Sequence, residues 1–231
     1  MAKRHFTPAV FSFLRELAEN NDKTWWEENK DRYIETVREP ALDFITDFAP
    51  HLAKISRYFT ADTRTVGGSL MRPYRDTRFT TDKTRYKTNV GIQFRHEKGR
   101  DIHAPSFYLH LEPSGSFAGV GMWRPDSATA ARVRHRIADH PDEWSAATTA
   151  RKFVGAWSLE RHDDDMLKRV PKELDGDHPH RDDLRLKSFV AGSRLSQKEV
   201  TTAGFDQRLA AMFEHTKKYA QFLCDSIGAP F

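Results

Sequence analysis

The chain has 231 residues, of which 38% are hydrophobic and 30% are charged, and its mean hydropathy is −0.72. That length supports one large hydrophobic core or two small ones. No run approaches the roughly 18–20 consecutive apolar residues of a membrane span. The single cysteine excludes an internal disulfide and a multi-cysteine zinc site. The first residues lack the apolar core of a secretory signal, so we expect a cytoplasmic protein with no membrane partner.

The positive charge of the chain is concentrated in one segment. The net charge of +4 comes from 37 basic and 33 acidic residues, yet residues 57–100 alone hold 11 basic and 4 acidic side chains. Eight of those 11 cations are arginine, which suits planar recognition of phosphate or carboxylate groups. A local excess of this kind indicates an anionic partner more firmly than the overall isoelectric point does.

Helical patterns open the chain. Thr7 followed by proline is typical of a helix start, and apolar residues at helical spacing predict a helix over residues 8–19. A capping-box pattern with Thr24 at its N-cap predicts a second helix over residues 24–37. A third helix is expected over residues 40–56.

The middle of the chain changes to a period of two, which is typical of strands. Apolar and polar residues alternate over residues 84–95 and predict a strand with one buried face. Further strands are expected over residues 107–112 and 117–123, on either side of a Pro-Ser-Gly turn. The short turn favours an antiparallel hairpin over a crossover connection.

Helices return toward the end of the chain. The remaining expected elements are helices over residues 127–139, 141–153 and 205–226, a polar loop over 160–183 with a short helix near Met166, and a strand over 184–190. The predicted fold class is therefore α+β, with an antiparallel sheet in the middle of the chain flanked by N-terminal and C-terminal helices. We expect residues 1–231 to form a single α+β domain.

The candidate functional segment is MRPYRDTRFTTDKTRYKT, residues 71–88. Its cations are Arg72, Arg75, Arg78, Lys83, Arg85 and Lys87. Lys83, Arg85 and Lys87 lie at alternate positions at the start of the predicted strand and would share the face opposite Tyr86. A buried face would then hold a cationic stripe rigid. Such a cluster binds phosphate or carboxylate through charge-assisted hydrogen bonds of about 1.5–3 kcal/mol each.

We therefore expect this cluster to bind a small phosphorylated or carboxylated molecule. Asp76 and Asp82 are expected to orient the cations around it. The expected ligand-binding residues are Arg75, Asp76, Arg78, Asp82, Lys83, Tyr86 and Lys87. No cofactor is implied, and the sequence leaves open whether the chain catalyses a reaction.

Two alternative functions use the same segment. Tyr74, Phe79 and Tyr86 are interleaved with the cations, as in proteins that stack the bases of nucleic acids. Nucleic acid is the less favoured partner, because the charge excess is modest and the flanking segments are acidic. In the other alternative, the Arg/Asp motif only holds the fold together, in a structural or protein-interaction domain.

Other site chemistries have weaker signals. Asp76 and Asp82 could form a general acid/base pair, but neighbouring arginines favour the ionised form of both carboxyl groups. Two groups of potential metal ligands match no defined motif, so we expect no metal site. These groups are Asp175, Asp177, His178 and His180 in one loop, and His110 with Glu112 on one strand face.

The segment RDTRFTTDKTRYKT, residues 75–88, resembles the signature of the family named domain of unknown function 2461. Its core reads Arg-Asp-x-Arg-Phe-x-x-Asp-Lys-x-x-Tyr-Lys-Thr. Similar stretches are NNDKTWWEENKDRY at 20–33, GVGMWRPD at 119–126 and DHPHRDDLRLKSF at 177–189. Arg85 stands where the family commonly has proline, and it adds a cation. The resemblance implies a compact α+β domain and no particular activity.

Overall fold

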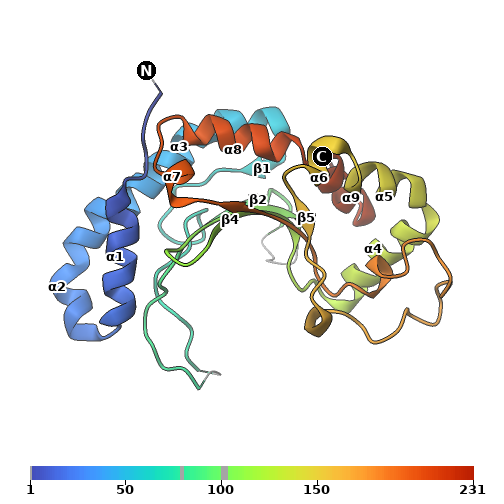
Figure 1. The fold of residues 1–231 in the computed structure, drawn as a ribbon, viewed down its shortest axis with the longest axis horizontal. Coiled ribbons are helices and arrows are strands. Elements are labelled where there is room, and N and C mark those ends of the chain that lie inside the picture. Colours follow the sequence, from blue (N-terminus) through green and yellow to red (C-terminus); the bar gives the residue numbers. More distant parts are fainter. Residues whose placement is uncertain (1, 79–80, 100–103) are drawn as a thin grey trace.

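The computed structural model describes residues 2–78, 81–99 and 104–231. Within these residues, six strands form one antiparallel sheet in the order β1-β2-β3-β4-β6-β5. The strands are β1 (Phe59–Thr60), β2 (Val90–His96), β3 (Ser106–Leu111), β4 (Ser116–Met122), β5 (Ser158–Leu159) and β6 (Phe189–Leu195). Figure 1 shows the sheet at the centre of an arch with a helical arm at each end.

In the described part of the sequence, three α-helices precede the first strand, three lie between β4 and β5, and three follow β6. They are α1 (Pro8–Glu19), α2 (Lys23–Tyr33), α3 (Glu39–Ile55), α4 (Ser127–Asp139), α5 (Pro141–Thr148), α6 (Arg151–Val154), α7 (Gln197–Val200), α8 (Phe205–Glu214) and α9 (Lys217–Ser226). Helices α3 and α8 lie side by side over one face of the sheet, α1 and α2 form one arm, and α4, α5 and α9 belong to the other (Figure 1). The predicted α+β class is confirmed.

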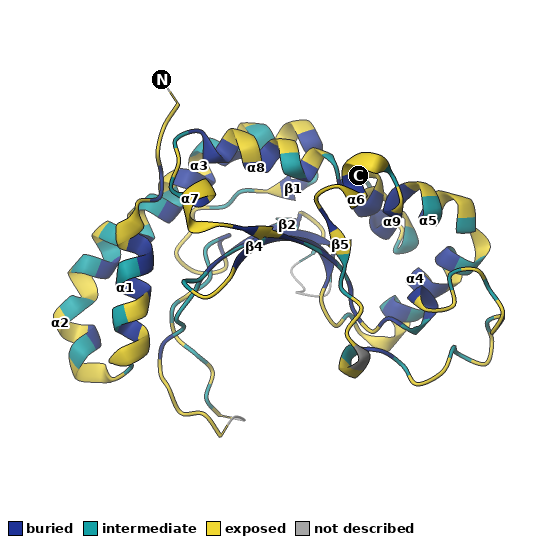
Figure 2. Cartoon of the chain, in the orientation of Figure 1, coloured by how far each residue is buried: buried dark blue, intermediate teal, exposed yellow. Residues whose placement is uncertain are grey.

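The two faces of the sheet have different surroundings. On the covered face, Phe94 stacks on Phe48 of α3 with ring centroids 4.8 Å apart, and Phe107 packs on Phe213 of α8 at 4.9 Å. Because side chains alternate along a strand, the neighbouring positions lie on the opposite face, which we call the inner face. One row across β2, β3, β4 and β6 on the inner face consists of Gln93, Tyr108, Gly119 and Gly192. Figure 2 shows that the strands are mostly buried and the arms more exposed.

The N-terminal helices follow the predicted pattern with two corrections. Helix α1 spans the predicted residues 8–19. The second helix is capped by Asp22 and not by Thr24, because the Asp22 carboxylate accepts a hydrogen bond from the Trp25 backbone N–H at 3.0 Å. A π-helix over Ile34–Arg38 joins α2 to α3, so the second and third helices are continuous in the structure.

The strand predicted over residues 84–95 is wrong in its first half, because β2 begins only at Val90. The side chain of Asn21 accepts hydrogen bonds from the backbone N–H groups of Arg85 and Tyr86, and donates one to the Tyr86 carbonyl. These backbone groups are therefore bound to α2's N-terminal loop and do not pair in the sheet. The period-two pattern correctly predicts an extended backbone, but it does not show which groups that backbone hydrogen-bonds to.

Three predicted elements near the C-terminus are also shortened or divided. The helix predicted over residues 141–153 is split into α5 and α6, and the helix predicted over 205–226 is split into α8 and α9. At the second break, the buried Thr216 hydroxyl donates to the Phe213 carbonyl and ends the first helix. The strand predicted over 184–190 begins at Phe189, and Leu184 lies in a 3-10 turn over Asp183–Arg185.

The pairing of β4 with β6 requires glycine at one position. Gly121 has φ +132°, a conformation that residues with a side chain rarely adopt. A Cβ atom at this position would lie 1.9 Å from the Phe189 carbonyl oxygen. Any substitution at Gly121 would therefore push the two strands apart where their pairing begins.

Candidate functional site

In the cationic segment predicted as a site, the described residues 71–78 and 81–88 form two extended antiparallel stretches, and we call residues 71–88 the hairpin segment. The two stretches are joined by an isolated bridge between Tyr74 and Tyr86 and by a backbone hydrogen bond from the Arg75 N–H to the Arg85 carbonyl. The hairpin segment extends from the sheet alongside the arm formed by α1 and α2 (Figure 1). Phe79, which sequence analysis considered for base stacking, lies outside the described residues.

Tyr86 anchors the hairpin segment to α2. Its ring stacks on Trp26 with centroids 4.3 Å apart and an interplanar angle of 14°, and only 4% of Tyr86 is exposed. The ring of Tyr74 contacts both Trp26 and Tyr86, but 48% of Tyr74 is exposed. The three hydrogen bonds of the Asn21 side chain hold the backbone beside this stack. Burial raises the pKa of the Tyr86 hydroxyl above its ordinary value.

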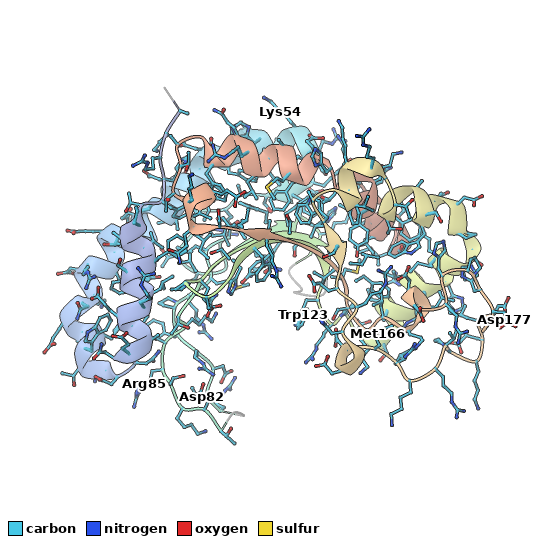
Figure 3. All side chains as sticks on the ribbon, in the orientation of Figure 1. Lys54, Asp82, Arg85, Trp123, Met166 and Asp177 are labelled. Atoms are coloured by element: carbon cyan, nitrogen blue, oxygen red, sulfur yellow. The ribbon has the colours of Figure 1, made fainter. Side chains whose placement is uncertain are left out.

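The cations farther along the hairpin segment have partners within it. The Arg78 guanidinium donates from Nε to one oxygen of Asp76 at 3.0 Å and from Nη2 to the other at 2.7 Å. Arg75 donates to Asp82 and to the Thr84 hydroxyl. Lys83 donates from Nζ to the Thr77 carbonyl at 2.9 Å. Figure 3 shows Asp82 on this part of the segment, away from the sheet.

Both aspartates are held in the ionised form. The pKa of Asp76 falls to about 2, chiefly because its carboxylate accepts hydrogen bonds from the Arg78 side chain and backbone. The pKa of Asp82 also falls to about 2, because the Thr84 backbone N–H and the Arg75 guanidinium donate to it. A general acid/base pair needs two carboxyl groups whose pKa values are driven apart. These two shift together, which suits a role in positioning the arginines.

Lys87 has a different environment at the base of the hairpin segment, where the chain enters the sheet. The Lys87 side chain is partly buried, and its backbone N–H donates to the Pro73 carbonyl at 2.7 Å. Burial and the nearby charge of Arg72 lower the pKa of the Lys87 ammonium. Within the described residues, neither of these two side chains has a hydrogen-bonding or ion-pair partner. The two positive charges repel each other, and no carboxylate in the described part of the chain pairs with either of them.

The structure therefore divides the seven expected site residues into four groups. Arg75, Asp76, Arg78 and Asp82 bind one another in pairs, Lys83 binds the backbone of the segment, and Tyr86 is buried against Trp26. Lys87 remains beside Arg72, which sequence analysis counted among the cations but left out of the site. Arg72 lies before the family signature, which begins at Arg75. Only its position among the cations of residues 71–88 could have indicated that it belongs to the site.

Two residues beyond Lys87, the chain enters a polar cluster on the inner face of the sheet. Nδ1 of His110 lies 3.2 Å from the Tyr108 hydroxyl and 3.4 Å from Nδ2 of Asn89, and its Nε2 lies 3.2 Å from Glu112. The ring of His110 also stacks on Phe117 at 4.7 Å. Burial raises the pKa of the Tyr108 hydroxyl to about 12, so this group acts as a neutral hydrogen-bonding group.

The two candidate groups of metal ligands do not converge. Among the residues that the structure describes, no three His, Cys, Asp or Glu side chains are placed to hold a metal ion. In the loop near residue 180, the His180 ring turns toward α5, where its Nε2 lies 2.9 Å from the Ser145 hydroxyl. His110 and Glu112 do meet, but as a pair within the polar cluster.

Searches of curated proteins and of solved structures found no match to this chain. Within the described residues, no helix combines the length and the apolar character needed to cross a membrane. A family model described as a conserved hypothetical protein, DUF2461, matches residues 9–222, nearly the whole chain. The chain therefore belongs to the DUF2461 family, as the signature in the hairpin segment predicted.

Proposed function

We propose that this protein binds a small anionic molecule, phosphorylated or carboxylated, at the base of the hairpin segment. The observation that carries the proposal is the partly buried Lys87 ammonium, which lies near Arg72 and has no partner in the described residues. Burying a charge without a counter-charge costs free energy. An anion bound between these cations would offset both the burial and the mutual repulsion.

The rest of the hairpin segment supports this proposal as a frame. Arg75 and Arg78 each have an aspartate partner, so a ligand would have to compete with a carboxylate for either guanidinium. In this proposal, the paired residues Arg75, Asp76, Arg78 and Asp82 shape the segment, and Tyr86 fastens it to α2, whereas the exposed Lys83 lies outside the site. Lys87, with Arg72, contacts the ligand directly. A group held in place before binding loses less entropy when the ligand arrives.

Nucleic-acid binding is less favoured by these contacts. Base stacking needs exposed aromatic faces beside the cations. Among the described aromatics of the segment, Tyr86 is buried under Trp26, and Tyr74 is the exposed one. One exposed ring beside paired arginines offers a stacking surface for only one base of a nucleic acid.

The experiment is a thermal-shift and calorimetric comparison of the wild type with Lys87→Met and Lys83→Met. Each variant removes one positive charge from the hairpin segment, so they are matched in net charge. The probes are inorganic phosphate, pyrophosphate and citrate. We expect at least one anion to raise the melting temperature of the wild type and of Lys83→Met, because a bound ligand stabilises by mass action, about 2.7 kcal/mol at one hundred times Kd. Lys87→Met should lose this effect.

Other outcomes would decide against the proposal. If no probe stabilises the wild type, or if both variants lose binding equally, the base of the segment is not a specific site. Without ligand, Lys87→Met should be at least as stable as the wild type, and a large loss of stability would favour the structural alternative. Affinity for single-stranded DNA that grows with oligonucleotide length and falls steeply with salt would favour nucleic acid.

A further inference from the structure

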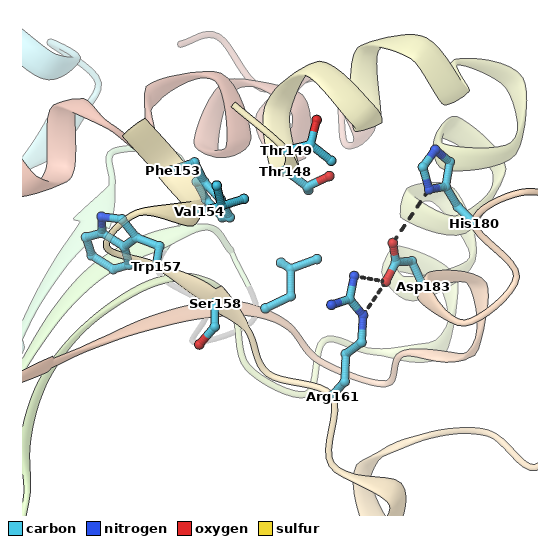
Figure 4. A pocket seen from close by; sticks show the side chains of 10 residues that line it. Thr148, Thr149, Phe153, Val154, Trp157, Ser158, Arg161, His180 and Asp183 are labelled. Carbon is cyan, nitrogen blue, oxygen red and sulfur yellow. Dashed lines mark hydrogen bonds and ion pairs between the residues drawn. The ribbon is translucent and has the colours of Figure 1, made fainter. Parts of the chain in front are cut away.

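The arm opposite the hairpin segment contains a cavity of about 340 Å³ that the proposed function does not use. Its walls come from the end of α5, from α6, from β5 and from the turn that begins at Asp183. The lining residues are Thr148, Thr149, Phe153, Val154, Trp157, Ser158, Leu159, Arg161, His180 and Asp183. Figure 4 shows aromatic and aliphatic side chains at one end and the charged groups at the other.

The charged end is built around a buried carboxylate. Asp183 is only 4% exposed, yet both its oxygens are satisfied. Oδ2 accepts a hydrogen bond from the indole N–H of Trp144 at 2.8 Å. Oδ1 accepts one from Nε of Arg161 at 2.8 Å and forms an ion pair with Nη2 of Arg161 at 2.8 Å. Charge-assisted bonds of this kind fix the plane of a guanidinium. Asp183 therefore holds Arg161 in one orientation at the edge of the cavity.

Arg161 keeps unused donors on the side away from Asp183. The edge formed by Nε and Nη2 is occupied, which leaves the end formed by Nη1 and the second N–H of Nη2. Nη1 has no partner within the described residues, and Figure 4 shows the third guanidinium nitrogen pointing toward the middle of the cavity. Two parallel N–H groups at this end match the two oxygens of a carboxylate.

Three other polar groups of the cavity already have hydrogen-bond partners. The hydroxyl of Thr148 donates to the Trp144 carbonyl at 2.8 Å, and that of Thr149 donates to the Ser145 carbonyl at 2.7 Å. The indole N–H of Trp157 donates to the Met212 carbonyl at 3.2 Å. Apart from Ser158 and His180, the remaining wall is apolar, so the main chemistry offered to a ligand is one cationic fork beside an apolar surface.

Ser145, His180 and Asp183 have the side chains of a hydrolytic triad, but not its geometry. Nδ1 of His180 lies 3.9 Å from Asp183, beyond hydrogen-bond distance, and the carboxylate is occupied by Arg161 and Trp144. Nε2 of His180 also lies 3.2 Å from the Pro141 carbonyl, which competes with the serine. A triad needs the carboxylate to orient the imidazole, so this cluster is better suited to binding.

We propose that this cavity binds a small monocarboxylic acid with an aromatic or branched apolar body. The carboxylate would lie against the free end of the Arg161 guanidinium, and the apolar body would contact Phe153, Trp157 and Leu159. A single cation that already shares its charge with Asp183 suits a monoanion better than a phosphate dianion. The volume is at the small end of the range for ligand pockets.

The test uses phenylacetate as the probe, with phenylacetamide as its neutral analogue and inorganic phosphate as the anion without an apolar body. Binding is followed by tryptophan fluorescence, because Trp157 lines the cavity, and by thermal shift. We expect saturable binding of phenylacetate in the millimolar range, about tenfold weaker binding of phenylacetamide, and no effect of phosphate on the fluorescence. Equal binding of the acid and the amide, or no saturable binding of phenylacetate, would overturn the proposal.

Variants locate the binding. Arg161→Met should abolish phenylacetate binding, whereas Arg151→Met, which removes an exposed arginine of α6 outside the cavity lining, should leave it unchanged. If Arg161→Met does not fold, the pair Val154→Glu and Val154→Gln replaces it, because Val154 lines the cavity and is 57% exposed. The glutamate should weaken phenylacetate binding several-fold and the glutamine should not. Wild-type affinity for phenylacetate in Val154→Glu would contradict the proposal. Lys87→Met, which changes the other proposed site, should leave phenylacetate binding unchanged.

Discussion

Both arms of the arch contain an arginine–aspartate arrangement near a tryptophan, and the two arrangements differ in burial. In the hairpin segment, Asp76 and Arg78 are exposed, and the stack of Trp26 on Tyr86 holds the segment in place. In the opposite arm, the Asp183 carboxylate is buried and receives the Trp144 N–H directly. Exposed ion pairs contribute little to stability, whereas a buried carboxylate that loses its partners or is removed has a large effect.

The difference shows that the same residue types serve different purposes in the two arms. In the hairpin segment, the two aspartates pair with Arg75 and Arg78, whereas the partly buried Lys87 lies near Arg72 without a carboxylate partner in the described residues. In the other arm, one aspartate joins a helix, a turn and an arginine through hydrogen bonds. Charge counting along the sequence finds the first arrangement and misses the second.

The largest expected effect separates the two aspartates. Asp183→Ala should lower the free energy of unfolding by about 2–3 kcal/mol, because the buried Trp144 N–H loses its acceptor and Arg161 loses its counter-charge. The measurement is urea denaturation followed by fluorescence. The matched control is Asp76→Ala, whose denaturation midpoint should not move. If both variants are destabilised equally, burial is not what distinguishes the two arms.

A smaller effect tests how the hairpin segment is attached. Asn21→Ala removes three hydrogen bonds to the backbone of Arg85 and Tyr86. We expect the free energy of unfolding to fall by about 1–2 kcal/mol relative to the wild type. We also expect hydrogen exchange to accelerate more in the hairpin segment than in β3. Asn20→Ala is the control, since its amide donates only to a carbonyl of its own helix. Unchanged exchange in the segment would show that the aromatic stack alone holds it.

The pH dependence of the hairpin segment should be local and confined to acid. The folded pKa values of Asp76 and Asp82, about 2, lie below the ordinary value of 3.8. The contribution of these two carboxylates to the local structure of the hairpin segment is therefore fully present above about pH 4. It is lost as the pH falls toward about 2. NMR titration of the backbone amides of Arg78 and Thr84 would follow this change. Midpoints near the ordinary value would mean that the two ion pairs do not persist in solution.

The smallest expected effect concerns Tyr86, which sequence analysis placed in the ligand site. Tyr86→Phe keeps the ring on Trp26 and removes a hydroxyl that makes no hydrogen bond within the described residues. Stability should stay within about 0.5 kcal/mol of the wild type, and anion binding should be unchanged. Loss of anion binding in a stable Tyr86→Phe protein would return this hydroxyl to the ligand site.

Much of the fold could be predicted because its signals are local. Thr7 and the proline after it mark the start of α1, and the apolar alternation around Leu109 marks β3. The strand predicted from residue 84 failed because periodicity reports an extended backbone and not its partner. Here the partner is the side chain of Asn21, far away in the sequence.

The candidate site was only partly predictable for the same reason. The cationic run pointed to the hairpin segment, but the sequence does not show which cations pair with a carboxylate, as Arg75 does with Asp82. The cavity in the other arm had no signal in the sequence. Arg161 and Asp183 lie at the two ends of a polar stretch that sequence analysis interpreted as a loop, and their contact depends on packing against Trp144.

The strand order of the sheet has a consequence for how the chain folds. Strands β2, β3 and β4 are neighbours in sequence and in space, whereas β6 pairs with β4 only after α4, α5 and α6 have intervened. Contacts that close long loops form late, because the entropy of closure must be overcome first. We therefore expect the β2–β4 meander to be protected early in pulsed hydrogen exchange. The arm that contains Asp183 should gain protection later, when β6 joins the sheet and closes the second half of the arch.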